Sequence, residues 1–398
     1  MNDMPACAPQ TTQQFLVSHG GPFYELQRRL RLLHEHALMS GRRAVVFIGL
    51  AWGIPLLLGL PQSLSFDVSS GLTYVADVTV WARFVIGIGA LVFAEQQVEK
   101  SLQEKLQQAV SASIIAPSSL TEAAYAVNQA LVRRNSRIAE VLCVLIAAVA
   151  ACVVLRHHYM VDASSWAVVA SPMGNSVTPA GWWSIIVSIP LFWFLTARGL
   201  WRHLVWSLLL RRLARLDLCL VSTHPDGKGG IAFLADYPNA YTTCVFGVSC
   251  AVAATIAQNL LHETATITNI TILMAAWLVI ILALFAFPLS AFTRPLSHLK
   301  RVSMARLGAQ ATQYHRMVER KLIGSNVAVA ATSEDRRDQE VADPTKQFEL
   351  TRKLSIVLLS RSTLLPVSAA ALVPFAIVAS TKVPIKEVLS LVKKLLLL

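Results

Sequence analysis

The sequence predicts an all-α integral membrane protein, and three observations support this fold class. Of 398 residues, 55% are hydrophobic and only 15% are charged, whereas soluble globular chains have roughly 25% charged residues. Several apolar runs approach the length of about 20 residues that a membrane-spanning helix needs. Lys and Arg are concentrated in alternate connections between these runs, a pattern typical of polytopic membrane proteins.

Six apolar runs predict six transmembrane helices within a membrane domain at 44–292. They are residues 44–60, 79–95, 138–155, 182–197, 243–261 and 270–290. The chain after the second and fourth runs is rich in helix formers. We therefore expect these two helices to continue into cytoplasmic extensions, 96–137 and 198–242.

The distribution of Lys and Arg orients the six spans. The segments 1–43, 96–137, 198–242 and 291–361 together carry 29 of these residues, whereas the connections 61–78, 156–181 and 262–269 carry only Arg156. Basic residues stay on the cytoplasmic side, so both termini are predicted to be cytoplasmic. We therefore expect the basic residues that give the chain its formal net charge of +12 to contact the anionic headgroups of the lipid bilayer. We expect no nucleic acid partner.

Two further cytoplasmic segments flank the spans. The segment 1–43 has an amphipathic stripe beside a basic face, and 293–361 is predicted to be helical, so that with the extensions it builds a cytoplasmic helical layer. The stripe consists of Phe23, Leu26, Leu30, Leu33 and Ala37, and the basic face of Arg28, Arg29 and Arg31. This pattern fits a helix lying in the membrane surface and equally a helix packed within a cytoplasmic subdomain.

The last segment, 362–398, is predicted to form a re-entrant or half-inserted hydrophobic hairpin followed by an amphipathic helix. Residues 363–380 are apolar but contain Pro366 and Pro374, and each proline removes a helical hydrogen bond. If this stretch crossed the membrane, the lysines that follow it would lie outside, against the charge rule. A true seventh span is the alternative.

The stretch STHPDGKGGIAF at 222–233 is the candidate ligand loop. Pro225, Asp226 and Gly227 favour a turn. Backbone N–H groups at a glycine-rich helix start can also cradle an anion. The candidate residues for such an anion or ligand site are His224, Asp226, Lys228, Gly229 and Gly230. The spacing does not match a phosphate-binding loop, so a structural turn is the other interpretation.

Three charged residues lie within or at the ends of the predicted spans. Arg83 falls in the outer third of the second span, where it could pair with Glu263 or Asp162 or extend outward to the headgroups. Glu95 and Glu140 fall at the inner ends of the second and third spans, where we expect them to reach water unaided. Intramembrane charges are candidate functional residues.

A polar cluster lies at the outer end of the fifth span, and the predicted spans carry no charged residue near the membrane midplane. The cluster consists of Gln258, Asn259, His262 and Glu263. No ionisable side chain lies near the predicted midplane, which disfavours a proton-coupled transporter but permits a hydrophobic gate. Gly247, Ala251 and Thr255 have the spacing of closely packed membrane helices, within one chain or between subunits.

No pattern predicts an enzyme. The six cysteines lack zinc-ligand spacing, and we expect free thiols, no metal site, no catalytic residues and no cofactor.

Four stretches together resemble a family of uncharacterised bacterial polytopic membrane proteins of similar length. They are GGPFYELQRRLRLL (20–33), LDLCLVSTHPDGKGGIAFL (216–234), DQEVADPTKQFELTRKLSIVLLSRSTLL (338–365) and VPIKEVLSLVKKLLLL (383–398). The THPDG-x-GG stretch is the most specific of these. The resemblance implies a bacterial inner (cytoplasmic) membrane and a shared helical fold, and it implies no activity.

Three functions fit these features. The first is a channel-like permeation protein formed by a homo-oligomer, consistent with the uncharged midplane and the small-residue faces. The second is a non-transporting sensor or scaffold that recruits a cytoplasmic partner or anionic lipid through its basic surface. The third is a membrane enzyme that uses the loop 222–233.

Overall fold

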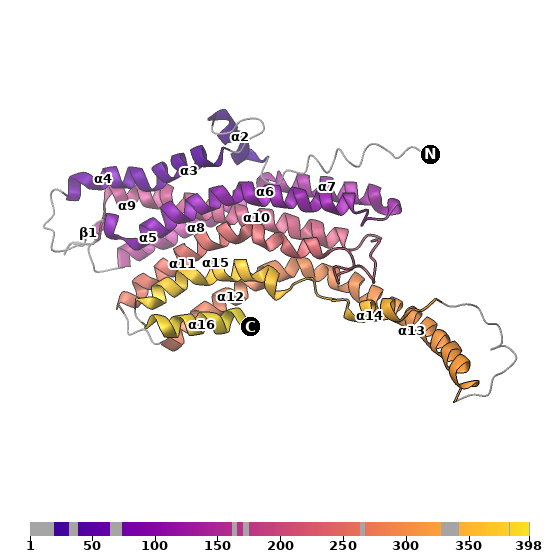
Figure 1. Cartoon of the computed structure of the whole chain (residues 1–398). Helices are drawn as coiled ribbons and strands as arrows, with labels where there is room; N and C mark the ends of the chain where they lie inside the picture. The colour runs from indigo at the N-terminus through magenta and orange to yellow at the C-terminus, as the bar shows by residue number, and fades with distance from the viewer. Residues whose placement is uncertain are drawn as a thin grey trace.

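The computed structural model describes residues 20–31, 39–63, 74–160, 165–169, 175–262, 267–327, 342–381 and 383–397. This part of the chain is almost entirely helical, and seven of its helices are long and apolar enough to cross a membrane. They lie side by side in one elongated bundle (Figure 1). The predicted all-α membrane fold is confirmed at this level.

Each of the six predicted runs overlaps one of these candidate spans, and a seventh lies near the C-terminus. The seven are Ser40–Gly59, Val78–Ser111, Arg137–His157, Pro179–Leu213, Ala232–Gln258, Asn269–Ile323 and Arg361–Ser380.

Five of the candidate spans join segments of different helical type. In Asn269–Ile323 a 3₁₀ turn separates two long α-helices, and the other four combine the following segments. They are α3 (Ser40–Ile48), π-helical η1 (Gly49–Gly53) and α4 (Ile54–Ser63); α5 (Val78–Val80), π-helical η3 (Trp81–Gly87) and α6 (Ile88–Ser111); α9 (Pro179–Trp183), π-helical η5 (Ser184–Ser188) and α10 (Ile189–Leu213); and 3₁₀-helical η6 (Ala232–Tyr241) with α11 (Thr242–His262).

The remaining elements are short connections, one two-stranded sheet and the other helices. They are α2 (Pro22–Arg29), η2 (Tyr74–Ala76), η4 (Pro117–Ser119), α7 (Leu120–Arg134), α8 (Arg137–Met160), β1 (Val168–Val169), β2 (Ser176–Val177), α12 (Ile267–Leu289), η7 (Ser290–Phe292), α13 (Thr293–Ile323), α14 (Thr345–Lys353), α15 (Arg361–Ser380) and α16 (Ile385–Leu397).

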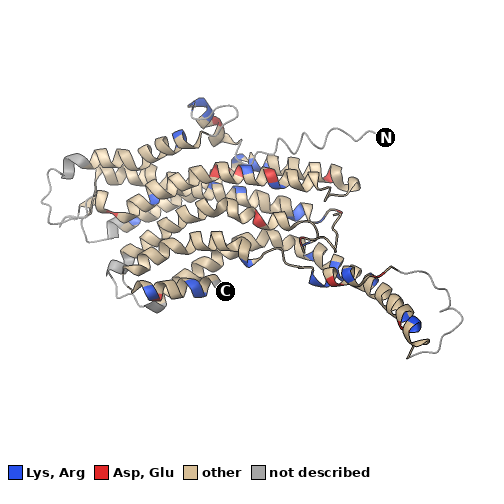
Figure 2. Ribbon diagram, in the orientation of Figure 1, with Lys and Arg blue, Asp and Glu red and all other residues tan. Residues whose placement is uncertain are grey.

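Two of the spans continue well beyond their apolar runs and form the base of the molecule. The ends of α6 and α10 pack with α7, η6 and the first turns of α13 around Trp206, which is fully buried. From this base α13 runs away from the bundle, and of the described elements only α14 accompanies it (Figure 1). Lys and Arg gather at this end of the bundle and along α13, with a second group on α16 (Figure 2).

Residues 361–380 form one continuous helix, α15, in spite of Pro366 and Pro374. Pro366 is exposed in the second turn, whereas protein covers the helix at Pro374, which is buried where α15 packs against α11 and α12, an arrangement that membrane helices tolerate. After α15 the chain turns back, and α16 lies antiparallel against α15 and α12 (Figure 1). By length and composition α15 is a seventh candidate span, the alternative that the sequence left open.

Three spans contain a π-helical turn at the same end of the bundle, and η1 contacts both η3 and η5. A π-turn interrupts the regular α-helical ladder, and side chains from neighbouring segments bond to its carbonyl groups. Ser188 donates to Ala51 O over 2.6 Å, and the Tyr74 hydroxyl donates to Trp52 O over 3.1 Å. These bonds join the first candidate span to the fourth and to η2, the turn that precedes the second.

α11 crosses the second span at a point where only glycine fits. A Cβ placed on Gly247 would lie 2.5 Å from the Ala90 Cβ and 3.4 Å from Gly87 O. Close backbone approach of this kind is what small residues allow in membrane helices. The small-residue face of α11 therefore serves packing within the chain at Gly247.

Replacing Gly247 with Ala is predicted to destabilise the bundle by ~1–3 kcal/mol, because the added methyl group overpacks this crossing. Gly199 in α10 is the matched control, since nothing lies within 4 Å of the position of its Cβ. Gly199→Ala should be neutral or stabilise by up to about 1 kcal/mol through helix propensity. Thermal unfolding in one detergent compares the two, and equal melting temperatures would contradict the close approach.

Candidate functional site

A buried group of charged residues joins four helices where their apolar stretches end. It consists of Arg43 from α3, Glu95 from α6, Glu140 from α8, and Arg198 and Arg202 from α10, and is called the Arg–Glu cluster below. The arginine side chains are at most 7% exposed and Glu95 is 15% exposed.

Glu95 is the centre of the cluster. Its Oε2 lies 2.6 Å from Nη2 of Arg43, while its Oε1 lies 3.0 Å from Nη1 of Arg198 and 2.9 Å from Nη1 of Arg202. Arg198 also faces Glu140, with its Nε 3.7 Å from Oε1. One carboxylate thus holds three guanidinium groups from two other helices.

The expectation that Glu95 and Glu140 reach water unaided is wrong, because both side chains are largely buried and both face arginines. The signal that sequence reasoning missed lies on α10. Arg198 and Arg202 are four residues apart and so share one face of a helix, at the depth where Glu95 ends the second apolar run. A carboxylate buried at that depth needs a partner of opposite charge, and Arg198 and Arg202 are the nearest candidates at that depth.

At the other end of the bundle Asp77 gathers polar groups from three parts of the chain. As the N-cap of α5 it accepts hydrogen bonds from the backbone N–H and the hydroxyl of Thr79. It also accepts from Trp166 Nε1 over 2.9 Å and from Gln258 Nε2 over 3.2 Å. The sequence analysis did not select Asp77, although an Asp two residues before Thr at the start of a span is a capping signal.

Arg83, one turn further along this span, donates from Nη2 to Thr255 Oγ1 over 3.1 Å. Its two predicted partners, Glu263 and Asp162, lie outside the described residues. Of the predicted outer polar cluster, only the Gln258 side chain is described. The side chains of Asn259 and His262, like Glu263, lie outside the description.

The loop 222–233 is organised around the carboxylate of Asp226. The backbone N–H groups of Lys228, Gly230 and Ala232 all donate to it, over 2.8 to 3.1 Å, and Nδ1 of His224 lies 2.8 Å from its Oδ1. The N–H groups that could cradle an external anion therefore already bind an anion of the same loop. The ligand role of this loop stays a prediction, whereas these bonds stabilise it as a turn.

The same loop is tied to the segment that leads into α15. Nζ of Lys228 donates to Leu358 O over 2.5 Å, and Ser355 N donates to Gly227 O over 2.8 Å. Gly229 and Gly230 have φ angles of 71° and 95°, which glycine adopts without strain. The loop thus holds the segment between α14 and α15 beside the start of η6.

Burial of Asp226 opposes its ionisation, but the N–H groups of Lys228, Ala232 and Gly230 and the His224 side chain outweigh this effect. Together they hold the pKa of Asp226 below its ordinary value of 3.8. Within the described residues no group of three or more His, Cys, Asp and Glu side chains could hold a metal ion.

Comparison with known proteins gives no relative: no family model, no curated protein and no solved structure matches the chain.

Glu95→Gln is predicted to destabilise the protein by ~3–5 kcal/mol, because it leaves buried guanidinium groups without their counter-charge. Glu104→Gln is the control, since Glu104 is exposed on the same helix and its replacement should change the free energy of unfolding by no more than about 0.5 kcal/mol. Chemical denaturation in detergent measures both. A Glu95 variant as stable as the Glu104 variant would show that the cluster does not hold the helices together.

Asp226→Asn is predicted to cost ~1–3 kcal/mol at neutral pH, because the loop N–H groups lose an ionised acceptor. Since the pKa of Asp226 is depressed in the folded state, this stabilisation is present above about pH 3.8 and is lost as the pH falls through the folded pKa. The gap in melting temperature between wild type and Asp226→Asn should therefore close in acid. Asp236→Asn, at an exposed position, should show no gap at either pH.

Proposed function

We propose that the protein is a membrane-anchored docking platform, in which the bundle carries α13 as a basic arm for an acidic cytoplasmic partner. The observation that carries this proposal is the isolation of α13. It has 31 residues, of which only Leu296 is buried, and it extends α12 directly through the single 3₁₀ turn η7. A helix that leaves its own protein in this way presents most of its surface to other molecules.

The charge of the arm supports an acidic partner. α13 carries seven Lys and Arg residues against one acidic residue, Glu319, and α14 adds three against one (Figure 2). Electrostatic complementarity speeds and orients association with a surface of opposite sign and excludes a surface of like sign. A second copy of this arm would be repelled, so the partner is a different, acidic protein.

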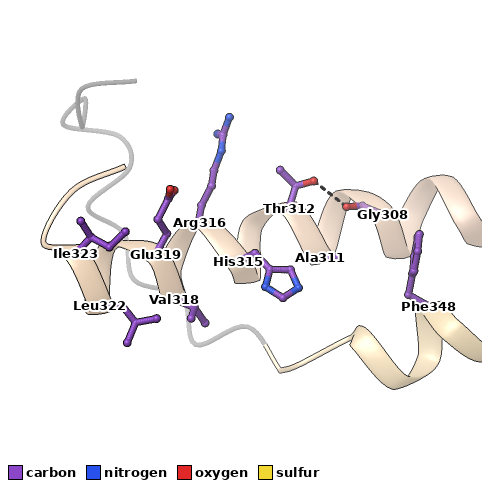
Figure 3. Close-up of a pocket in the computed structure, with 10 residues that line it drawn as sticks. All are labelled: Gly308, Ala311, Thr312, His315, Arg316, Val318, Glu319, Leu322, Ile323 and Phe348. Atoms are coloured by element: carbon purple, nitrogen blue, oxygen red, sulfur yellow. Dashed lines mark hydrogen bonds between the residues drawn. The ribbon is translucent and has the colours of Figure 1, made fainter. Parts of the chain in front are cut away.

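The distal half of the arm also offers apolar contacts. Val318, Leu322 and His315 lie on the same side of α13 as Phe348 of α14, whereas Arg316 and Glu319 point away (Figure 3). Leu322 is 80% exposed and Ile323 is 64% exposed. An amphipathic helix fits this arrangement, with its apolar side against Val318, Leu322 and Phe348.

The orientation of the bundle belongs to the same proposal. The excess of basic residues in alternate connections supports a cytoplasmic arm, and the family resemblance supports a bacterial inner membrane. We infer that α15 crosses the bilayer, because Ala379 near its end lies in one buried cluster with Ile270 near the start of α12. α16, with 13 residues, is about 20 Å long and is the half-inserted part of the hairpin. In this topology the lysines of α16 lie on the outer side, as an exception to the charge rule, and the C-terminus is not cytoplasmic.

A permeation pathway between several copies is the second candidate, and α8 favours it. This helix has the least buried apolar window of the seven spans, at 22%, and turns Val141, Leu145 and Val149 outward. Such a face packs against lipid or against a neighbouring subunit.

The docking proposal predicts that full-length protein in mild detergent captures an acidic protein from its native cells. Two double variants should each weaken binding of the purified partner at least ~10-fold, about 1.4 kcal/mol. One is Arg306→Glu with Arg316→Glu, and the other is Leu322→Ala with Ile323→Ala. Lys100→Glu with Arg215→Glu is the matched control, since it makes the same charge change at exposed positions outside the arm. Titration of the purified partner measures the affinities.

Three outcomes would contradict the docking function. Binding that nuclease removes would assign the arm to a nucleic acid. Equal affinity for the arm variants and the control would place any contact elsewhere. Single-channel currents from a multi-copy assembly, with no partner bound by the wild-type arm, would favour permeation.

A further inference from the structure

The N-terminal helix α2 is attached to the bundle at one end, beside the Arg–Glu cluster. The backbone N–H of Phe23 donates to Glu140 Oε2 over 3.0 Å, and the Arg198 guanidinium carbon lies 4.9 Å from the centre of the Phe23 ring. The ring also packs edge-on against Phe194, with 4.8 Å between centroids. Phe23 therefore covers the cluster and contacts two of its charged members.

The two residues before α2 are built for this contact. Gly20 and Gly21 have φ angles of 106° and 90°, which side-chain-bearing residues rarely adopt. A Cβ on Gly20 would overlap Oδ1 of Asn135, and a Cβ on Gly21 would overlap Oε1 of Glu140. The sequence Gly-Gly-Pro-Phe thus seats the start of α2 on α8 and α10 by close approach.

Beyond its attached end, α2 exposes apolar and basic side chains together. Leu26 and Leu30 are more than half exposed, and Arg28, Arg29 and Arg31 are exposed beside them. Leucines that insert at the headgroup boundary and arginines that contact anionic headgroups are the two components of an interfacial helix.

The place of α2 in the bundle matches this chemistry. The Arg–Glu cluster lies where the apolar stretches of α6 and α10 give way to polar sequence, so a helix seated on it lies at the level of a membrane surface. Figure 1 shows α2 on the outside of the bundle, beside α3 and clear of α13. The exposed residues at the free end of α2 are therefore available to headgroups and are not covered by another part of the described chain.

We infer that α2 is a latch for an anionic membrane surface, which holds Phe23 seated over the Arg–Glu cluster when acidic lipid is present. Attraction of Arg28, Arg29 and Arg31 to the surface adds to the binding of Leu26 and Leu30 and keeps the helix docked. In neutral lipid the basic contribution is absent, and α2 leaves its seat more often. This inference does not depend on the docking function of α13.

Hydrogen exchange of the full-length protein in nanodiscs tests the latch. Peptides covering residues 20–31 should exchange at least ~10-fold more slowly in phosphatidylcholine mixed with phosphatidylglycerol than in phosphatidylcholine alone, since each basic residue contributes about 1 kcal/mol at an anionic surface. Arg28→Gln with Arg29→Gln and Arg31→Gln should abolish the difference between the two lipids. The control makes the same charge change at exposed positions of α13 and should preserve the difference in exchange between the two lipids. It combines Arg301→Gln, Arg306→Gln and Arg316→Gln.

Phe23→Ala separates seating from lipid attraction. It should speed exchange of residues 20–31 in both lipids and leave the loop 222–233 unchanged, which shows that the bundle remains folded. Equal exchange of the wild type in the two lipids, or a lipid difference that survives in the α2 triple variant, would overturn the latch.

Discussion

The arrangement of the spans depends on the burial of Glu95 among three arginines. Removing a charged group from water costs several kcal/mol unless opposite charges and hydrogen bonds replace the water. Arg43 approaches from α3, and Arg198 and Arg202 from α10, with all three within 3.0 Å of a single carboxylate. Apolar side chains can slide against one another at little cost, whereas this geometry permits only one depth and one rotation for each helix.

The same principle, one carboxylate satisfying several donors, recurs at two other joints. Asp77 connects the start of the second span with Trp166 and with Gln258 of α11. Asp226 connects three backbone N–H groups within the loop 222–233. Lipid and a packed interior both lack water to hydrate a stray donor. The chain has fewer acidic than basic residues. Of its acidic residues, Glu95 and Asp77 each join elements that are far apart in the sequence, and Asp226 closes a turn.

The sequence predicted the long apolar helices because a run of about 20 apolar residues satisfies its backbone groups internally as a helix. It could not predict the partner of Glu95, since hydropathy gives the depth of a charge and not the direction in which it points. The π-helical turns η1, η3 and η5 leave no signal in periodicity, because apolar residues surround them on all sides. Asp226 was selected correctly as a notable residue, but only coordinates reveal that it binds the N–H groups of its own loop. For α15, two prolines argued against a helix that neighbouring α11 in fact supports.

The connection between bundle and arm follows from where α12 is held. Phe285 and Leu289, near the end of α12, are buried in the same core as Trp206 of α10, and Phe292 and Leu296 continue this contact through η7 into α13. Beyond Leu296 no residue of α13 is buried, so the arm is fixed to the bundle at its base, and beyond it α14 packs along α13. Because Arg198 and Arg202 also belong to α10, the base of the arm and the Arg–Glu cluster are joined by one continuous helix, and α10 fixes the position of both.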